Sequence, residues 1–122
     1  MDKLINLLEK AISLGQKEIE FPDFTLKYLD RLKSMKNRVG SITDRYSPSW
    51  YKYRKERFGY TNINRNYHLT YKMRNTMRIT NKAIYTEADY YKFLVKKFPH
   101  EVPVGPIDLP HLIAEIKKYL LG

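Results

Sequence analysis

Apolar residues recur at helical spacing near both ends of the chain. At the N-terminus they fill positions i, i+3, i+4, i+7 and i+8, which predicts a helix with one apolar stripe that ends at Gly15. Near the C-terminus, Asp108 is expected to cap a last helix whose stripe packs on the core, with a partner-binding helix as the alternative. The two stripes are Leu4, Leu7, Leu8, Ala11 and Ile12, and Leu109, Leu112, Ile113, Ile116 and Leu120.

A second helix is predicted after Phe21 and Pro22, with Asp23 as its cap and Gly40 as its end. Its apolar positions again follow helical spacing, so one face is expected to be buried. The residues of that face are Tyr28, Leu29, Leu32, Met35 and Val39.

The pattern is less regular in residues 41–67, which we call the arm. Ser47 and Pro48 predict the start of a short helix through Phe58, ended by Gly59. The polar run 61–66 predicts a loop, because short polar side chains compete with backbone pairing. The alternative is that the whole arm is mobile.

After the arm, helical and strand patterns alternate. Leu69, Met73 and Met77 predict a short helix, and 79–80 with 83–86 predict two strands around a turn at Asn81. A helix ending near Phe98, a proline-rich link and the last helix follow. The sequence therefore predicts one domain of the α+β class, with amphipathic helices packed on a small antiparallel sheet and a basic aromatic arm in the middle.

Charge is concentrated in the middle of the chain. Residues 45–82 hold ten basic residues against one acid, Glu56, so this stretch is +9 in a chain of net charge +10. It also holds eight of the seventeen aromatic residues. A segment with this excess of one sign predicts a polyanionic partner, or a protein surface with acidic patches.

The sequence carries few candidates for catalysis. There is no cysteine, and no two of the three histidines have the spacing of a metal site. The acids are scattered and the glycines are single, so neither a two-metal site nor a phosphate-binding loop is indicated. We expect no enzymatic activity, no cofactor and no metal. The apolar runs are too short for a membrane span.

The candidate binding residues lie in and just after the arm, where bases and aromatic rings alternate. In one interpretation the bases neutralise phosphates while the rings stack on nucleobases or contact a protein partner. In the other, the rings pack on the core and only the charge is exposed. The candidates are Trp50, Tyr53, Arg54, Lys55, Arg57, Arg65, Lys72 and Arg74.

From Trp50 onward, the order of motifs resembles the tail-completion, or virion morphogenesis, proteins of long-tailed bacteriophages. A tryptophan follows a Pro-containing turn at Pro48 and precedes a run rich in Tyr, Lys and Arg. The segment 68–79 resembles the family's helix start, with Thr70, Met73 and Thr76 at matching positions. A hairpin, a helix begun by Tyr90 or Tyr91, a proline-rich link over 103–107 and a short final helix complete the resemblance.

The resemblance implies a structural protein of the neck or tail end that assembles as a hexameric ring. Its partners would be tail-tube, terminator or connector proteins, with DNA passing through the lumen. It would reside in the virion, and in the host cytoplasm during assembly. Two alternatives remain: a small basic nucleic-acid-binding protein, viral or ribosome-associated, and an interaction adaptor whose arm folds on its partner.

Overall fold

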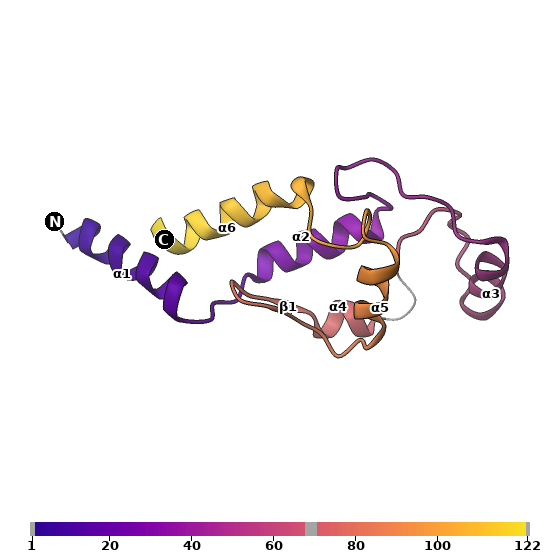
Figure 1. Cartoon of the computed structure of the whole chain (residues 1–122), viewed down its shortest axis with the longest axis horizontal. Coiled ribbons are helices and arrows are strands. Elements are labelled where there is room, and N and C mark those ends of the chain that lie inside the picture. Colours follow the sequence, from indigo (N-terminus) through magenta and orange to yellow (C-terminus); the bar gives the residue numbers. More distant parts are fainter. Residues whose placement is uncertain (1, 68–70, 122) are drawn as a thin grey trace.

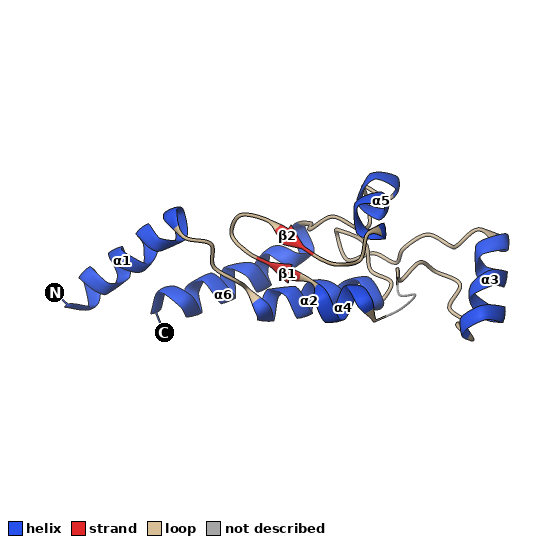
Figure 2. Cartoon of the chain, turned by 90° about the horizontal axis from the view of Figure 1, so that it is seen from below, coloured by secondary structure: helices blue, strands red, loops and turns tan. Residues whose placement is uncertain are grey.

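The chain forms an elongated α+β structure with helices around a two-stranded antiparallel sheet, which confirms the predicted fold class (Figures 1 and 2). The structure is a computed structural model, and it describes residues 2–67 and 71–121. The N-terminal helix lies at one end of the molecule and the arm at the other. In chain order the elements are α1 (Asp2–Gln16), α2 (Pro22–Lys33), α3 (Pro48–Phe58), α4 (Lys72–Thr76), β1 (Arg78–Ile79), β2 (Ile84–Tyr85), α5 (Tyr90–Lys97), the 3-10 turn η1 (Pro106–Asp108) and α6 (Leu109–Leu121).

The core is built around α2. Tyr28, Leu29 and Leu32 are buried as predicted, and Phe21 and Phe24 join them. Asp23 is not the cap, because the helix already begins at Pro22 and Asp23 lies in its first turn. Instead, Glu115 of α6 accepts the backbone N–H of Asp23 at 2.9 Å. A carboxylate from a distant helix thus satisfies an N–H that has no partner within α2.

The second helix ends earlier than predicted, at Lys33, and Met35 adopts a positive φ of 60°. The side-chain oxygen of Asn37 accepts the backbone N–H groups of Val39 and Ser41, both at 3.0 Å. This local pairing competes with helix continuation. The prediction that Val39 belongs to the buried stripe is therefore wrong, and its side chain is 68% exposed.

The predicted hairpin is confirmed, with Arg78 opposite Tyr85 and Ile79 opposite Ile84. Asn81 in its turn also fixes the end of α1. Its side-chain oxygen accepts the N–H of Ile19 at 2.8 Å, and its amide nitrogen donates to the carbonyl of Lys17 at 2.9 Å. The hairpin thereby sets the direction in which α1 leaves the body. The predicted helix residue Leu69 lies outside the described residues.

The two terminal helices bury less of their apolar stripes than expected. Leu112 and Ile116 of α6 pack against the core cluster but remain half-buried, and Ile113 is exposed. In α1, Leu4, Leu8 and Ile12 are 54–56% exposed. No residue described in either helix is fully buried. Both helices therefore retain uncovered apolar surface at the same end of the molecule.

One buried ion pair joins α2 to the segment before α6. The Arg31 Nε and Nη2 atoms donate to the two carboxylate oxygens of Asp108 at 3.1 and 2.9 Å, with side-chain exposures of 5% and 1%. The Asp108 carboxylate also accepts the N–H of Gly105 at 2.9 Å, while Arg31 donates to the carbonyl of Pro103 at 2.9 Å. The side chain expected to cap the last helix thus also holds the proline-rich link against α2.

Candidate interaction site on the arm

The arm leaves the body through a short stem, formed by residues 43–46 and 63–66. The two segments run antiparallel. The backbone N–H of Arg65 donates to the carbonyl of Asp44, and that of Tyr46 donates to the carbonyl of Ile63, each at 2.9 Å. The Thr43 hydroxyl is buried and donates to the Arg65 carbonyl at 2.6 Å. In Figure 2, α3 lies beyond the stem at the end of the molecule opposite α1.

Glu101 attaches both ends of the arm to the body. Its carboxylate accepts the backbone N–H of Asp44 and the Arg65 Nε–H, each at 2.8 Å, and the Tyr67 hydroxyl. Burial by itself raises the pKa of Glu101. The hydrogen bonds from Arg65, Tyr67 and Asp44, with the positive charge of Arg65, outweigh this effect and leave the pKa below its usual value.

This environment makes the stability of the arm's attachment depend on pH. The charged form of Glu101 is favoured on folding, so its contribution is complete above the ordinary glutamate pKa of about 4.3 and is lost as pH falls through the lower folded value. We expect Glu101→Gln to lower the free energy of unfolding at pH 7 by about 1–3 kcal/mol. In urea titrations, the difference from the parent chain should shrink as pH falls from about 6 to about 3.

The control for this prediction is Glu56→Gln, on the exposed surface of α3. Its difference from the parent chain should stay below about 1 kcal/mol throughout. A Glu101→Gln deficit that does not change with pH would contradict a role for the Glu101 charge.

Local sequence signals define α3 as predicted. The Ser47 hydroxyl accepts the backbone N–H of Trp50 at 3.4 Å, and Pro48 occupies the first turn. Gly59 ends the helix in the left-handed region, with a φ of 75°. Four rings form an aromatic ladder on α3 and the residues after it. Neighbouring centroids lie 5.0, 6.0 and 5.8 Å apart along Trp50, Tyr53, Phe58 and Tyr60.

Arg54 occupies the inner side of α3 and is only 2% exposed. Its guanidinium lies 4.5 Å from the ring centroid of Tyr46 and 4.8 Å from that of Tyr60. It also donates to the side-chain oxygens of Asn62 and Asn66 at 3.3 and 3.1 Å. Arg54 was predicted as a binding residue, but here it links the helix to the loop that returns to the stem.

The remaining candidates separate into three groups. Lys55 and Arg57 are exposed on α3, and Trp50 and Tyr53 are 40% and 44% exposed beside them. Arg65 is mostly buried at the stem, with its guanidinium 4.4 Å above the Phe98 ring. Lys72 and Arg74 belong to α4, apart from the arm, and Arg74 pairs with Asp30 at 2.9 Å. The accessible candidates on the arm are therefore Trp50, Tyr53, Lys55 and Arg57.

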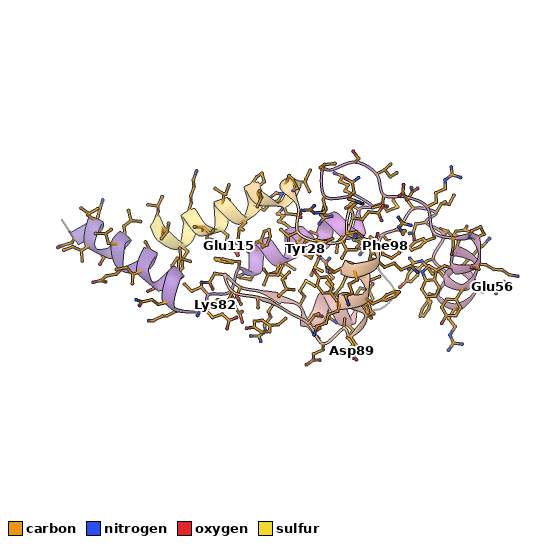
Figure 3. The ribbon with its side chains drawn as sticks, in the orientation of Figure 1. Tyr28, Glu56, Lys82, Asp89, Phe98 and Glu115 are labelled. Carbon is orange, nitrogen blue, oxygen red and sulfur yellow. The ribbon has the colours of Figure 1, made fainter. Side chains whose placement is uncertain are left out.

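An open pocket of about 610 Å³ lies between the arm and α5, and we call it the α3–α5 pocket. Three cationic side chains line it: Arg54, Arg65 and Lys97. Phe93 is 58% exposed although it lines the pocket. In Figure 3, Phe98 marks the body side of this region and Glu56 marks α3. The aromatic lining residues are Tyr46, Trp50, Tyr67, Tyr90, Phe93 and Phe98.

No family model, curated protein or solved structure matches this chain. Within residues 2–67 and 71–121, no cluster of three or more His, Asp or Glu side chains could hold a metal ion. Among these residues, no helix is both long enough and apolar enough to cross a membrane.

Sequence reasoning missed the body side of this site. Glu101 lies 34 to 57 residues from its arm partners, and Phe93 lies 26 to 47 residues from the arm residues that line the pocket. Both belong to segments whose local pattern predicts only a helix and a link. The isolated acid in a proline-rich link was the one available signal for Glu101. The signal for Phe93 was its position off the buried face of its helix, since Tyr91, Leu94, Val95 and Phe98 formed that face.

Proposed function

We propose that the protein is a non-enzymatic structural subunit of a virion, at the neck or tail end of a long-tailed bacteriophage. It would assemble as a ring with tail-tube, terminator or connector proteins, and its arm would contact an acidic neighbour or the passing DNA. The observation that carries the proposal is that the elongated chain exposes apolar or aromatic side chains at both ends. One end has the exposed apolar residues of α1, and the other has the arm (Figure 1).

The composition of the arm supports a contact role. Trp, Tyr and Arg are the residues most enriched at the energetic centres of protein interfaces. Trp50, Tyr53 and Arg57 are exposed together on α3. Trp50 stacks on Tyr53 and belongs to no buried core cluster among the described residues, so its removal should leave the body intact.

The test is the double variant Trp50→Ala with Arg57→Ala, introduced into the gene in its own phage. We expect the purified variant to unfold within about 1 kcal/mol of the parent chain, because both side chains are exposed. Electron microscopy of lysates should reveal filled heads and tails that fail to join, or tails with defective ends. The matched control is Leu26→Ala with Lys27→Ala, exposed on α2, which should give normal virions. Normal virions from the arm variant would refute the arm contact.

Nucleic-acid binding is the second candidate, and the exposed bases of α3 favour it. Lys52, Lys55 and Arg57 are accessible on a helix whose only acid is Glu56. Bases beside stacked rings are typical of proteins that bind nucleic acid without sequence preference. In this case the partner of the arm would be the DNA.

Binding measurements over a range of salt concentrations distinguish the two partners. If the arm binds duplex DNA, changing these three bases to Ala should weaken binding equally across sequences. The slope of log K against log salt should fall by about 0.9 for each phosphate that the variant no longer neutralises. Arg54 must be left unchanged, because it is buried. Failure of the parent chain to bind at low salt would leave an acidic protein surface as the partner of the arm.

A further inference from the structure

The apolar face of α1 follows helical spacing along the sequence but is left largely uncovered by the body. We call this face the α1 stripe, formed by Leu4, Ile5, Leu8 and Ile12, each about half exposed. Leu14 packs against the core cluster and Leu7 is half-buried, so α1 already contacts its own chain through another face. Contiguous apolar surface of this kind marks an interaction site.

The α3–α5 pocket has the opposite shape and matching chemistry. It is concave, rich in aromatic rings, and about 610 Å³ in volume. An apolar cavity of about 150 Å³ accommodates one benzene ring, so this pocket has space for roughly three or four aliphatic side chains. An amphipathic helix whose apolar face binds in a hydrophobic groove is a recurrent form of helix recognition, and the α1 stripe and the α3–α5 pocket have these two characters.

Charge complements this fit. Asp2 lies three residues before Ile5 and Glu9 lies four residues after it, so both acids border the α1 stripe. Three cationic side chains line the pocket, Arg54, Arg65 and Lys97, but Arg54 is buried and Arg65 already pairs with Glu101. Lys97 is exposed and lies 5.3 Å from the ring centroid of Phe93, where an incoming carboxylate can reach it. An acid beside the α1 stripe can thus pair with Lys97 at the pocket.

A chain cannot fill its own pocket with its own stripe, because α1 and the arm lie at opposite ends of the molecule (Figures 1 and 2). We propose that the α1 stripe of one copy docks into the α3–α5 pocket of a second copy. This inference rests on the proposed function, since it assigns the subunit contact of the ring. A contact between two different surfaces repeats head to tail, and closes into a ring when the rotation between copies allows it.

The absence of cysteine makes a directional test possible. Leu8→Cys places one thiol at the centre of the α1 stripe. Ser49→Cys places one at the pocket and leaves the aromatic side chains of the pocket in place. With a flexible bis-maleimide cross-linker, each variant alone should stay uncross-linked, and the mixture should give a covalent heterodimer. A chain carrying both thiols should give a ladder of multimers.

The other outcomes overturn the inference in different ways. Cross-linking of Leu8→Cys with itself would show that two α1 stripes pair with each other. A mixture that does not cross-link, while native mass spectrometry still detects oligomers, would refute this contact and leave the proposed function standing. A parent chain that is monomeric at all concentrations, alone and with its virion partners, would refute both.

A second measurement separates docking from folding. Leu8→Lys puts a positive charge into the contact with the aromatic pocket, beside Lys97. We therefore expect native mass spectrometry to detect monomer, and the dissociation constant of the oligomer to rise at least about 100-fold. The control Asn6→Lys adds the same positive charge at an exposed position outside the α1 stripe, and this variant should still form the oligomer. Equal thermal midpoints for both variants would establish that both remain folded. Oligomers unaffected by Leu8→Lys would contradict the docking.

Discussion

Asp108→Ala is expected to destabilise the protein by about 3–5 kcal/mol, because it leaves the Arg31 guanidinium buried without its carboxylate. The pair is bidentate and nearly inaccessible to solvent, with side-chain exposures of 5% and 1%. The same substitution removes the acceptor of the Gly105 N–H. Since a domain of this size has a total stability of about 5–15 kcal/mol, this loss removes from about a fifth to all of it.

Urea unfolding followed by circular dichroism measures this destabilisation. The matched control is Glu20→Ala, which breaks the Arg78–Glu20 pair at 2.7 Å. Both of its side chains are more than half exposed, so the expected destabilisation is below about 1 kcal/mol. We attribute the large effect of Asp108→Ala to the burial of the ion pair. A similar loss of unfolding free energy in the two variants would contradict this.

Arg54→Ala is expected to open the arm while leaving the body folded. The buried guanidinium stacks on Tyr46 and Tyr60, and each desolvated contact of this kind contributes about 2 kcal/mol. Arginine and alanine are both good helix formers, so α3 itself is little affected. We therefore expect the local opening free energy of the arm to fall by roughly 2–4 kcal/mol.

Native-state amide exchange measures this local change. Exchange in residues 47–64 should accelerate by at least about 30-fold, while the amides of α2 keep their rates. Lys55→Ala is the control, because Lys55 is the next residue on α3 and is exposed. Equal acceleration in α2 would mean that the arm and the body unfold as one unit.

Local signals in the sequence were sufficient for the elements whose ends depend on a few neighbouring residues. Ser47, Pro48 and Gly59 define α3, and the strand pattern around Asn81 defines the hairpin. The same reasoning made the second helix too long, because a helical stripe does not reveal the competing pairing of Asn37 with the backbone. Apolar spacing predicted that α1 is a helix, but it could not predict how much of the stripe the body would cover.

The site was predictable in part. Charge and aromatic content located the arm, but they did not separate the exposed Lys55 and Arg57 from the buried Arg54. All three residues lie on α3 and all three are positively charged. The difference lies in the face of α3 on which each one lies. The contacts of Glu101 with the arm depend on chain segments 34 to 57 residues apart, which only the tertiary structure brings together.

The stem gives the arm the character of an exchangeable module. Asp44 and Arg65 are held side by side by a backbone hydrogen bond, and Glu101 binds both ends from the body. The residues between them can therefore change in length and composition while the anchoring contacts stay the same, since longer closed loops cost little additional entropy. Substitutions in α3 and its flanking loops can thus change which partner the arm binds, with the buried core of α2 unchanged.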